Sequence, residues 1–281
     1  MRIRAPAKVN LWLRVVGKRD DGYHLIDSLM VPVGLYDEIE IIRGKRSKGI
    51  LTVTCDDPGV PSGEKNLAYR AASLLLGQKG VQDAVHIHIR KRIPVGGGLG
   101  GGSSDAAATL LGLNRLFHLG CRRREILSLA SGLGADVPFF IYGRPARARG
   151  IGDLVKPLDL FPRLWIVILY PGFPVSTRWV YHNLELTNST ENISIKSSLR
   201  DHKKLVRLLV NDLEKVTIRR YPRIGLLKER LVQEGAVGAL MAGSGSSAFG
   251  IFSSGQSARK ALRRLRKEER GVRAYLARSL S

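Results

Sequence analysis

The amino-acid sequence predicts an α+β protein of two domains, and three observations lead to this fold class. Strand-like and helix-like segments follow one another without the regular alternation of a parallel α/β protein. Three glycine-rich turns separate these segments, and the composition shifts after Gly152. The 281 residues, of which 44% are hydrophobic, are enough for two ordinary domains. We therefore expect a first domain over residues 1–153 and a second over residues 154–281, with the last strand or helix free to return to the first domain.

The first half of the chain is predicted to contain strands, helices and a glycine-rich loop. Short apolar or β-branched segments bounded by turn residues predict strands at Ile39–Ile42, Leu51–Val53 and Val85–Ile89. His86 and His88 share one face of the last of these strands, and we interpret both as surface residues. Good helix formers at helical spacing predict helices over residues 66–76 and 123–130.

The second half is predicted to begin with a buried strand at Trp165–Leu169. Helical segments follow, interrupted at Pro222. Two strands, Val237–Met241 and Ser247–Phe252, flank the third glycine turn. The basic segment 259–270 has the apolar stripe of a surface helix, formed by Ala261, Leu262 and Leu265.

The chain is strongly basic, with 46 Lys and Arg against 24 Asp and Glu and a formal net charge of +22. Either a nucleic-acid partner or a solvated basic surface on an enzyme with an anionic substrate explains this excess. We favour the second explanation, because the basic residues are spread along the chain. The charged and proline-broken N-terminus argues against a secretion signal, and no apolar run is long enough for a membrane-spanning helix. Cys55 and Cys121 form no disulfide framework, so a cytoplasmic protein is expected.

Residues 94–105, PVGGGLGGGSSD, form a glycine-rich loop between a predicted strand and a predicted helix. Glycine occupies six of the seven positions from Gly96 to Gly102, so the backbone can approach an anion closely. Ser103 or Ser104 is expected to cap the following helix, whose first N–H groups and dipole favour a phosphate. The loop lacks the lysine of the Walker pattern. Its formal match to G-x-G-x-x-G lacks the second parallel strand of a dinucleotide-binding fold.

Three motifs, taken in order, resemble those of the GHMP kinases. They are Pro6-Ala7-Lys8-Val9-Asn10-Leu11, the glycine loop, and Gly243-Ser244-Gly245-Ser246-Ser247. The resemblance implies a two-domain GHMP kinase fold, with an N-terminal domain like one found in ribosomal proteins and a ferredoxin-like C-terminal domain. It also implies that ATP is bound by Pro94, Val95, Gly96, Gly97, Gly98, Leu99, Gly100, Gly101, Gly102, Ser103 and Ser104, together with Asn66.

Four further segments are most similar to one GHMP family, the 4-diphosphocytidyl-2-C-methyl-D-erythritol kinases. They are Asp21-Gly22-Tyr23-His24-Leu25, Asn66-Leu67, residues 134–140 (GADVPFF) and Arg149-Gly150-Ile151-Gly152-Asp153. The resemblance implies ATP-dependent phosphorylation of the 2-hydroxyl of the diphosphocytidyl substrate, in the non-mevalonate (methylerythritol phosphate) route to isoprenoids. Mg²⁺ is expected to accompany ATP, and its protein ligands are left unassigned.

The resemblance implies Lys8 and Asp136 as the catalytic residues. Phosphoryl transfer requires positioning and charge stabilisation, and Asp136 would orient or deprotonate the attacking hydroxyl. Lys8 would pair with Asp136 and attract the γ-phosphate, and Asn10 would hydrogen-bond the methylerythritol hydroxyls. Each catalytic residue also has a structural explanation: Asp136 as the N-cap of the next helical turn, and Lys8 as a lysine at a strand edge.

Tyr23 and His24 are expected to recognise the cytidine. A base stacked on an aromatic ring gains roughly 1–3 kcal/mol, and an imidazole can hydrogen-bond the pyrimidine edge. The resemblance implies a second aromatic residue, for which Tyr181 occupies the matching position and Trp179 and Phe173 are alternatives. The structural alternative for Tyr23 and His24 is the tip of a β-turn after Asp-Gly.

Two other functions stand as alternatives. The first is a GHMP kinase for homoserine, mevalonate or a sugar, which would have no use for Tyr23 and His24. The second is a nucleic-acid-binding protein on the same scaffold, which the net charge of +22 favours. Such a protein would have no need of Lys8, Asp136 and three phosphate turns together. We therefore expect small-molecule substrates only, no nucleic acid and no membrane association, and a monomer or weak homodimer.

Overall fold

The computed structural model describes residues 1–46, 50–185 and 202–280. The chain divides into two compact units, neither of which is one continuous stretch of sequence. Unit 1 contains Met1–Ala7, Tyr36–Val95 and Gly100–Gly143, and unit 2 contains Lys8–Leu35, Gly96–Leu99 and Arg144–Ser281. Strands β1 (Arg2–Lys18) and β2 (His24–Arg46) therefore each run through both units. The expected domain boundary at residue 153 stays a prediction.

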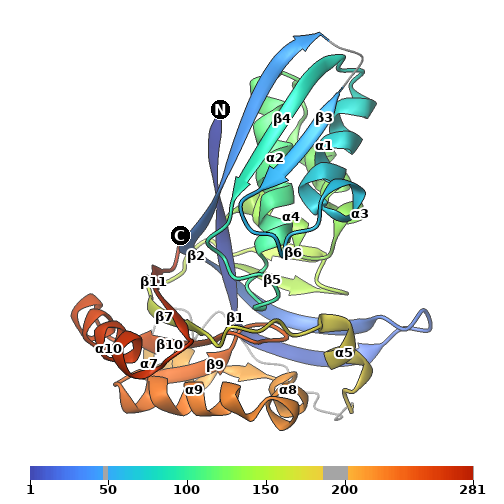
Figure 1. The fold of residues 1–281 in the computed structure, drawn as a ribbon. Helices are drawn as coiled ribbons and strands as arrows, with labels where there is room; N and C mark the ends of the chain where they lie inside the picture. The colour runs from blue at the N-terminus through green and yellow to red at the C-terminus, as the bar shows by residue number, and fades with distance from the viewer. Residues whose placement is uncertain (47–49, 186–201, 281) are drawn as a thin grey trace. The chain divides into compact units, whose positions relative to one another are not determined.

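Unit 1 combines a small mixed sheet with four helices (Figure 1). Strand β4 (Asp83–Arg90) lies between β3 (Leu51–Cys55), to which it is parallel, and the second half of β2, to which it is antiparallel. The helices are α1 (Leu67–Gln78), α2 (Gly101–Leu116), α3 (Arg123–Leu133) and α4 (Val137–Tyr142), and a 3-10 turn, η1 (Gly63–Lys65), precedes α1. Gly112 allows α2 to approach the sheet, because a Cβ there would lie 2.6 Å from Ile41 Cδ1.

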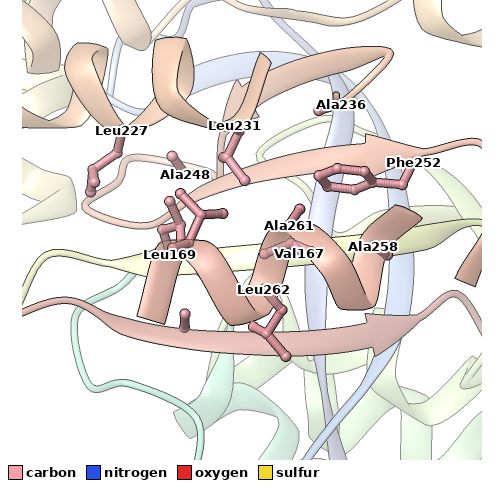
Figure 2. Packing of buried hydrophobic residues seen from close by; sticks show 12 residues of the cluster. Val167, Leu169, Leu227, Leu231, Ala236, Ala248, Phe252, Ala258, Ala261 and Leu262 are labelled. Atoms are coloured by element: carbon pink, nitrogen blue, oxygen red, sulfur yellow. The ribbon is translucent and has the colours of Figure 1, made fainter. Parts of the chain in front are cut away.

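Unit 2 contains an antiparallel sheet of four strands in the order β11-β7-β10-β9. These strands are β7 (Trp165–Tyr170), β9 (Gly238–Met241), β10 (Ala248–Phe252) and β11 (Arg273–Arg278). Helices α9 (Pro222–Gln233) and α10 (Gly255–Glu268) pack on one face of the sheet. Figure 2 shows the core between them, where Leu231 of α9 and Leu262 of α10 lie near Val167 and Leu169 of β7.

Other strands of unit 2 pair with the second half of β1 and the first half of β2, which belong to the same unit. Strand β5 (Ala146–Arg149) is antiparallel both to β2 and to β6 (Leu154–Pro157). Strand β8 (Val210–Asn211) is parallel to β1. Among the residues described, the unit also contains helices α5 (Thr177–His182), α7 (His202–Arg207) and α8 (Glu214–Arg220).

The predicted strands and helices are found, most with ends that differ by a few residues. The segment Ile39–Ile42 is a strand as predicted, but it is only part of the much longer strand β2. His86 and His88 lie on the outer face of β4 and contact the hydroxyls of Thr52 and Thr54, at 2.5 and 2.9 Å, which confirms the surface interpretation. The stripe of α10 is also buried as predicted. In the described part of the chain, no helix is long and apolar enough to cross a membrane.

The predicted cap of α2 is wrong. The helix begins at Gly101, two residues before Ser103, and Gly100 occupies the N-cap position with a φ of 73° and no side-chain capping bond. Only glycine adopts this left-handed conformation without a steric cost, so the glycine run itself determines where the helix starts.

Candidate functional site

Three segments of unit 2 that are distant in sequence meet in space. The backbone N–H of Lys8 donates to the carbonyl oxygen of Leu99 (2.9 Å), which ties β1 to the glycine loop. The N–H of Ser247 donates to the carbonyl oxygen of Gly97 (3.1 Å), which ties the loop to the turn between β9 and β10. The three predicted motifs are therefore neighbours in the fold.

Two glycines determine how closely the loop and the turn approach. Gly98 has a φ of +74°, and a Cβ there would lie 1.9 Å from the carbonyl oxygen of Ala242. Gly243 has a φ of +54°, and its Cβ would lie 2.9 Å from the carbonyl oxygen of Gly98 and 3.4 Å from Lys8 Nζ. Since these neighbours include backbone atoms, no side-chain rotation relieves the clash, and both positions require glycine.

The side chains of Lys8 and Asn10 belong to a buried hydrogen-bonded chain. Lys8 Nζ donates to Asn10 Oδ1 (2.7 Å), Asn10 Nδ2 donates to Ser28 Oγ (2.8 Å), and Ser28 Oγ donates to the carbonyl oxygen of Trp12 (2.7 Å). Lys8 is only 5% exposed, so the alternative of a solvated lysine at a strand edge is wrong. The order of donors and acceptors also determines the orientation of the Asn10 side-chain amide, because a flipped amide would place its NH₂ group against the ammonium group of Lys8.

The turn at Gly243–Ser247 is held by side chains that sequence analysis missed. Asn211 Nδ2 donates to the carbonyl oxygens of Met241 (3.0 Å) and Gly243 (2.7 Å). The hydroxyls of Thr177 and Ser244 lie 2.8 Å apart and share a hydrogen bond. Asn211 and Thr177 belong to no local pattern, so only the tertiary structure reveals them.

Tyr23 and His24 lie where the chain turns from β1 into β2. The turn is closed by the N–H of Arg19, which donates to the carbonyl oxygen of Tyr23 (2.7 Å), and the Tyr23 ring is exposed. The turn-tip location is confirmed, and it is compatible with a role in binding. Burial, and secondarily the charge of Lys18, lower the pKa of His24 below its ordinary value. The imidazole is therefore neutral at neutral pH, with one nitrogen that donates and one that accepts.

Tyr181 is the candidate aromatic that lies against His24. The two rings stack with centroids 5.2 Å apart and planes at 29°. Phe173 and Trp179 both pack against Tyr221 instead, with centroid distances of 5.3 and 6.1 Å. The structure thus brings together Tyr181 and His24, as the sequence position of Tyr181 suggested.

Unit 1 holds the other predicted residues. Asp136 occupies the N-cap position of α4, but it has helical dihedral angles and makes no capping hydrogen bond, so the capping explanation is wrong. Asn66 does cap α1: its Oδ1 accepts from the N–H of Ala68 (2.8 Å), and its Nδ2 donates to the carbonyl oxygen of Pro61 (3.0 Å). A contact between Asn66 and ATP stays a prediction. Within the residues described, no three His, Cys, Asp or Glu side chains are grouped to hold a metal ion.

Comparison with known proteins places this arrangement in a family. The model of the GHMP kinases N terminal domain matches residues 66–144, and the model of the GHMP kinases C terminal matches residues 194–270. A 4-diphosphocytidyl-2-C-methyl-D-erythritol kinase of Geobacter metallireducens is 48% identical over 261 residues, which cover 93% of this chain and 92% of that protein. The chain belongs to this family of GHMP kinases. A relative of the same name from Syntrophotalea carbinolica is 47% identical over 273 residues, which cover 96% of each chain.

Solved structures agree with this assignment. The crystal structure of a 4-(cytidine 5'-diphospho)-2C-methyl-D-erythritol kinase has a TM-score of 0.86 and 38% identity and covers 100% of both chains. A homoserine kinase from Cytophaga hutchinsonii has a TM-score of 0.73 at 19% identity and covers 100% of this chain and 94% of its own, which shows the shared fold alone. The predicted two-domain GHMP kinase fold is confirmed.

Proposed function

We propose that this chain transfers the γ-phosphoryl group of ATP to the 2-hydroxyl of 4-diphosphocytidyl-2-C-methyl-D-erythritol, in the non-mevalonate route to isoprenoid precursors. The observation that carries the proposal is the meeting of the three motifs in unit 2, where the Gly243 turn lies against both the glycine loop and Lys8. Family membership supports the choice of substrate, because relatives with 47–48% identity over nearly the whole chain are kinases of that name.

ATP binding is assigned to the glycine loop and the first turn of α2, residues 94–104. The loop has three glycines with positive φ, at positions 96, 98 and 100, so successive N–H groups can turn toward one anion. The N-terminus of α2 adds unpaired N–H groups and the positive end of the helix dipole. ATP would enter with Mg²⁺, which offsets the charge of the phosphates.

Lys8 and Asp136 are assigned to the chemical step. The buried ammonium of Lys8, held by Asn10, would stabilise the charge that develops on the transferred phosphoryl group. Asp136 would orient the 2-hydroxyl or accept its proton as the oxygen attacks the γ-phosphorus. Asn10 keeps one N–H and one lone pair beyond the two bonds described, which it could offer to the methylerythritol hydroxyls.

The cytosine is assigned to Tyr23 and His24. At a centroid distance of 5.2 Å the rings of His24 and Tyr181 are in contact, which leaves no room for a base between them. We expect the base to stack on the exposed ring of Tyr23, while the neutral imidazole of His24 pairs with its edge. Tyr181 would then hold the imidazole in position.

The test is ADP release with Mg·ATP and the diphosphocytidyl substrate, measured on the unmodified protein and on Asp136→Asn. We expect turnover of this substrate, none with mevalonate or homoserine, and a loss of about 10²–10⁴-fold in Asp136→Asn. Turnover of mevalonate or homoserine alone would overturn the substrate assignment, and equal rates in the two proteins would remove Asp136 from the mechanism. The cytoplasmic location, the lack of a nucleic-acid partner and the monomeric or weakly dimeric state stay predictions.

A further inference from the structure

Unit 1 contains a buried charged cluster that the proposed chemistry does not use. Lys91 Nζ donates to Asp37 Oδ2 (2.5 Å) and to Asp105 Oδ2 (2.8 Å). The three side chains are at most 4% exposed. Asp37 belongs to β2, Lys91 follows β4, and Asp105 lies in α2. The cluster therefore links the first turns of α2 to strand β2 and to the segment that follows β4.

The two carboxylates of the cluster have different surroundings. The second oxygen of Asp37, Oδ1, accepts from the N–H groups of Arg92 (2.6 Å) and Ile93 (2.9 Å), so the charged form of Asp37 is fully hydrogen-bonded. The second oxygen of Asp105, Oδ1, is buried and has no hydrogen-bond partner among the described residues. A buried carboxylate oxygen without a hydrogen bond disfavours the charged form of Asp105.

Burial raises the pKa of Asp105 to about 7, with Lys91 opposing the rise and the charge of Asp37 adding to it. Further ionisable residues near the cluster are Arg92, Asp56 and Cys55. Arg92 contacts Asp37 through its backbone N–H. Asp56 Oδ1 accepts from the N–H of Lys91 (2.8 Å). The thiol of Cys55 in β3 has a pKa that its own burial raises, with a smaller contribution from Asp105. Neither Asp56 nor Cys55 supplies a positive charge to Asp105, and within the described residues Lys91 is the cation that hydrogen-bonds it.

The cluster lies directly beside the start of α2. A Cβ built on Gly101, the first residue of the helix, would be 3.0 Å from Lys91 Nζ. Asp105 follows one helical turn later, so its charge lies close to the N–H groups assigned to the ATP phosphates. The cluster has a net charge of −1 when Asp105 is ionised and zero when Asp105 is protonated.

We infer that Asp105 is a positioning residue of the ATP site, which together with Lys91 and Asp37 fixes the first turn of α2 and takes up a proton when phosphates bind there. The inference rests on the proposed ATP-binding function. A bound phosphate favours the neutral cluster over the negative one, since like charges repel at short range. By linkage, the affinity for ATP falls as the pH rises through the pKa of Asp105.

The experiment compares the unmodified chain with Asp105→Asn, which keeps the size of the side chain and an acceptor for Lys91 but has no ionisable group. Mg·ATP binding is measured by calorimetry from pH 6 to pH 9 in buffers of different ionisation enthalpy, which reports proton uptake. The matched control is Asp83→Asn, in the exposed pair between Arg43 and Asp83 of the same unit. The protonation of free ATP contributes equally to the measurements on all three proteins. The pH effect of the Asp105 carboxyl is therefore the difference in affinity and in proton uptake between the proteins.

We expect proton uptake near pH 7 in the unmodified chain and in Asp83→Asn, and none beyond that of ATP in Asp105→Asn. Relative to Asp105→Asn, the affinity of the unmodified chain for ATP should fall about tenfold between pH 6 and pH 9. In steady-state kinetics, the difference in pH dependence between the unmodified chain and Asp105→Asn should appear in KM for ATP and not in kcat.

Identical pH profiles and proton uptake in all three proteins would overturn the inference and leave the kinase assignment standing. Failure of the unmodified chain to bind Mg·ATP would overturn the proposed function, and the inference with it. Should Asp105→Asn not fold, carbon-13 NMR of the aspartate carboxyls in the unmodified chain decides the matter. A carboxyl that titrates near pH 7 and shifts upward with ATP supports the inference, and the absence of such a shift refutes it.

Discussion

The close approach of the glycine loop to the third motif makes Gly98→Ala a demanding test of the site. The new Cβ would lie 1.9 Å from the carbonyl oxygen of Ala242, and ordinary contact begins at 3.4 Å, so the loop must move by about 1.5 Å. Such a shift breaks the hydrogen bond from Ser247 to Gly97, now 3.1 Å long, at a cost of about 1 kcal/mol. The left-handed backbone adds about 1–2 kcal/mol for alanine.

We therefore expect Gly98→Ala to lose about 2–3 kcal/mol of unfolding free energy, measured by urea denaturation. Displacement of a binding group by about 1 Å costs roughly 100-fold in rate, so kcat/KM for ATP should fall by about that factor. Gly120→Ala is the matched control, because Gly120 has a φ of +67° and its Cβ would meet no atom within 4 Å. It should lose about 1–2 kcal/mol through strain alone and keep its kcat/KM. If the two variants behaved alike, the close approach would not be needed for activity.

Three further predictions concern the surroundings of the site. Ser28→Ala leaves the buried Asn10 Nδ2 without its acceptor, so urea denaturation should show a loss of about 1–3 kcal/mol together with a lower kcat, and unchanged values would contradict the role of the hydrogen-bonded chain. Lys18→Met removes a charge that lowers the pKa of His24, so NMR titration should show a higher pKa for His24 in the variant. Protonation of His24 at low pH should increase KM for the cytidyl substrate. In the variant this increase should begin at a higher pH than in the unmodified protein. No shift in either measurement would mean that Lys18 is without effect on His24. Thr177→Val removes the bond to Ser244 and should lower the unfolding free energy by about 1 kcal/mol, and it should cause no additional loss in a Ser244→Ala background.

The regular elements could largely be predicted because their signals are local. In β4 the isoleucines and Val85 are buried while His86 is exposed, as the two-residue alternation of the sequence requires. The start of α2 was missed, since two signals compete there. Serine is a good cap, but the glycine run admits a left-handed residue earlier, at Gly100, and the helix begins after it.

The candidate site was predictable only in its motif residues. The glycines, Lys8 and Asp136 carry recognisable patterns, whereas the residues that support them do not. Ser28 lies 18 residues from Asn10, and Asn211 lies 32 residues from Gly243. Lys91 and Asp37 are 54 residues apart. Interactions of this range depend on the register and packing of whole elements, which no local pattern encodes.

The parallel pairing of β1 with β8 has a consequence for how the protein is made. Trp12 is in register with Val210, and Arg14 forms a 2.8 Å ion pair with Asp212, 198 residues later in the chain. At about 5–20 residues per second, a ribosome needs roughly 10–40 s to synthesise the chain between these partners. During that time the strand that carries Lys8 and Asn10 has no β8 to pair with, and the loop-closure entropy must still be overcome. The segment of the site that is synthesised early thus reaches its native contacts late, and a nascent chain acquires the complete site only after β8 and the turn at residues 243–247 have been synthesised.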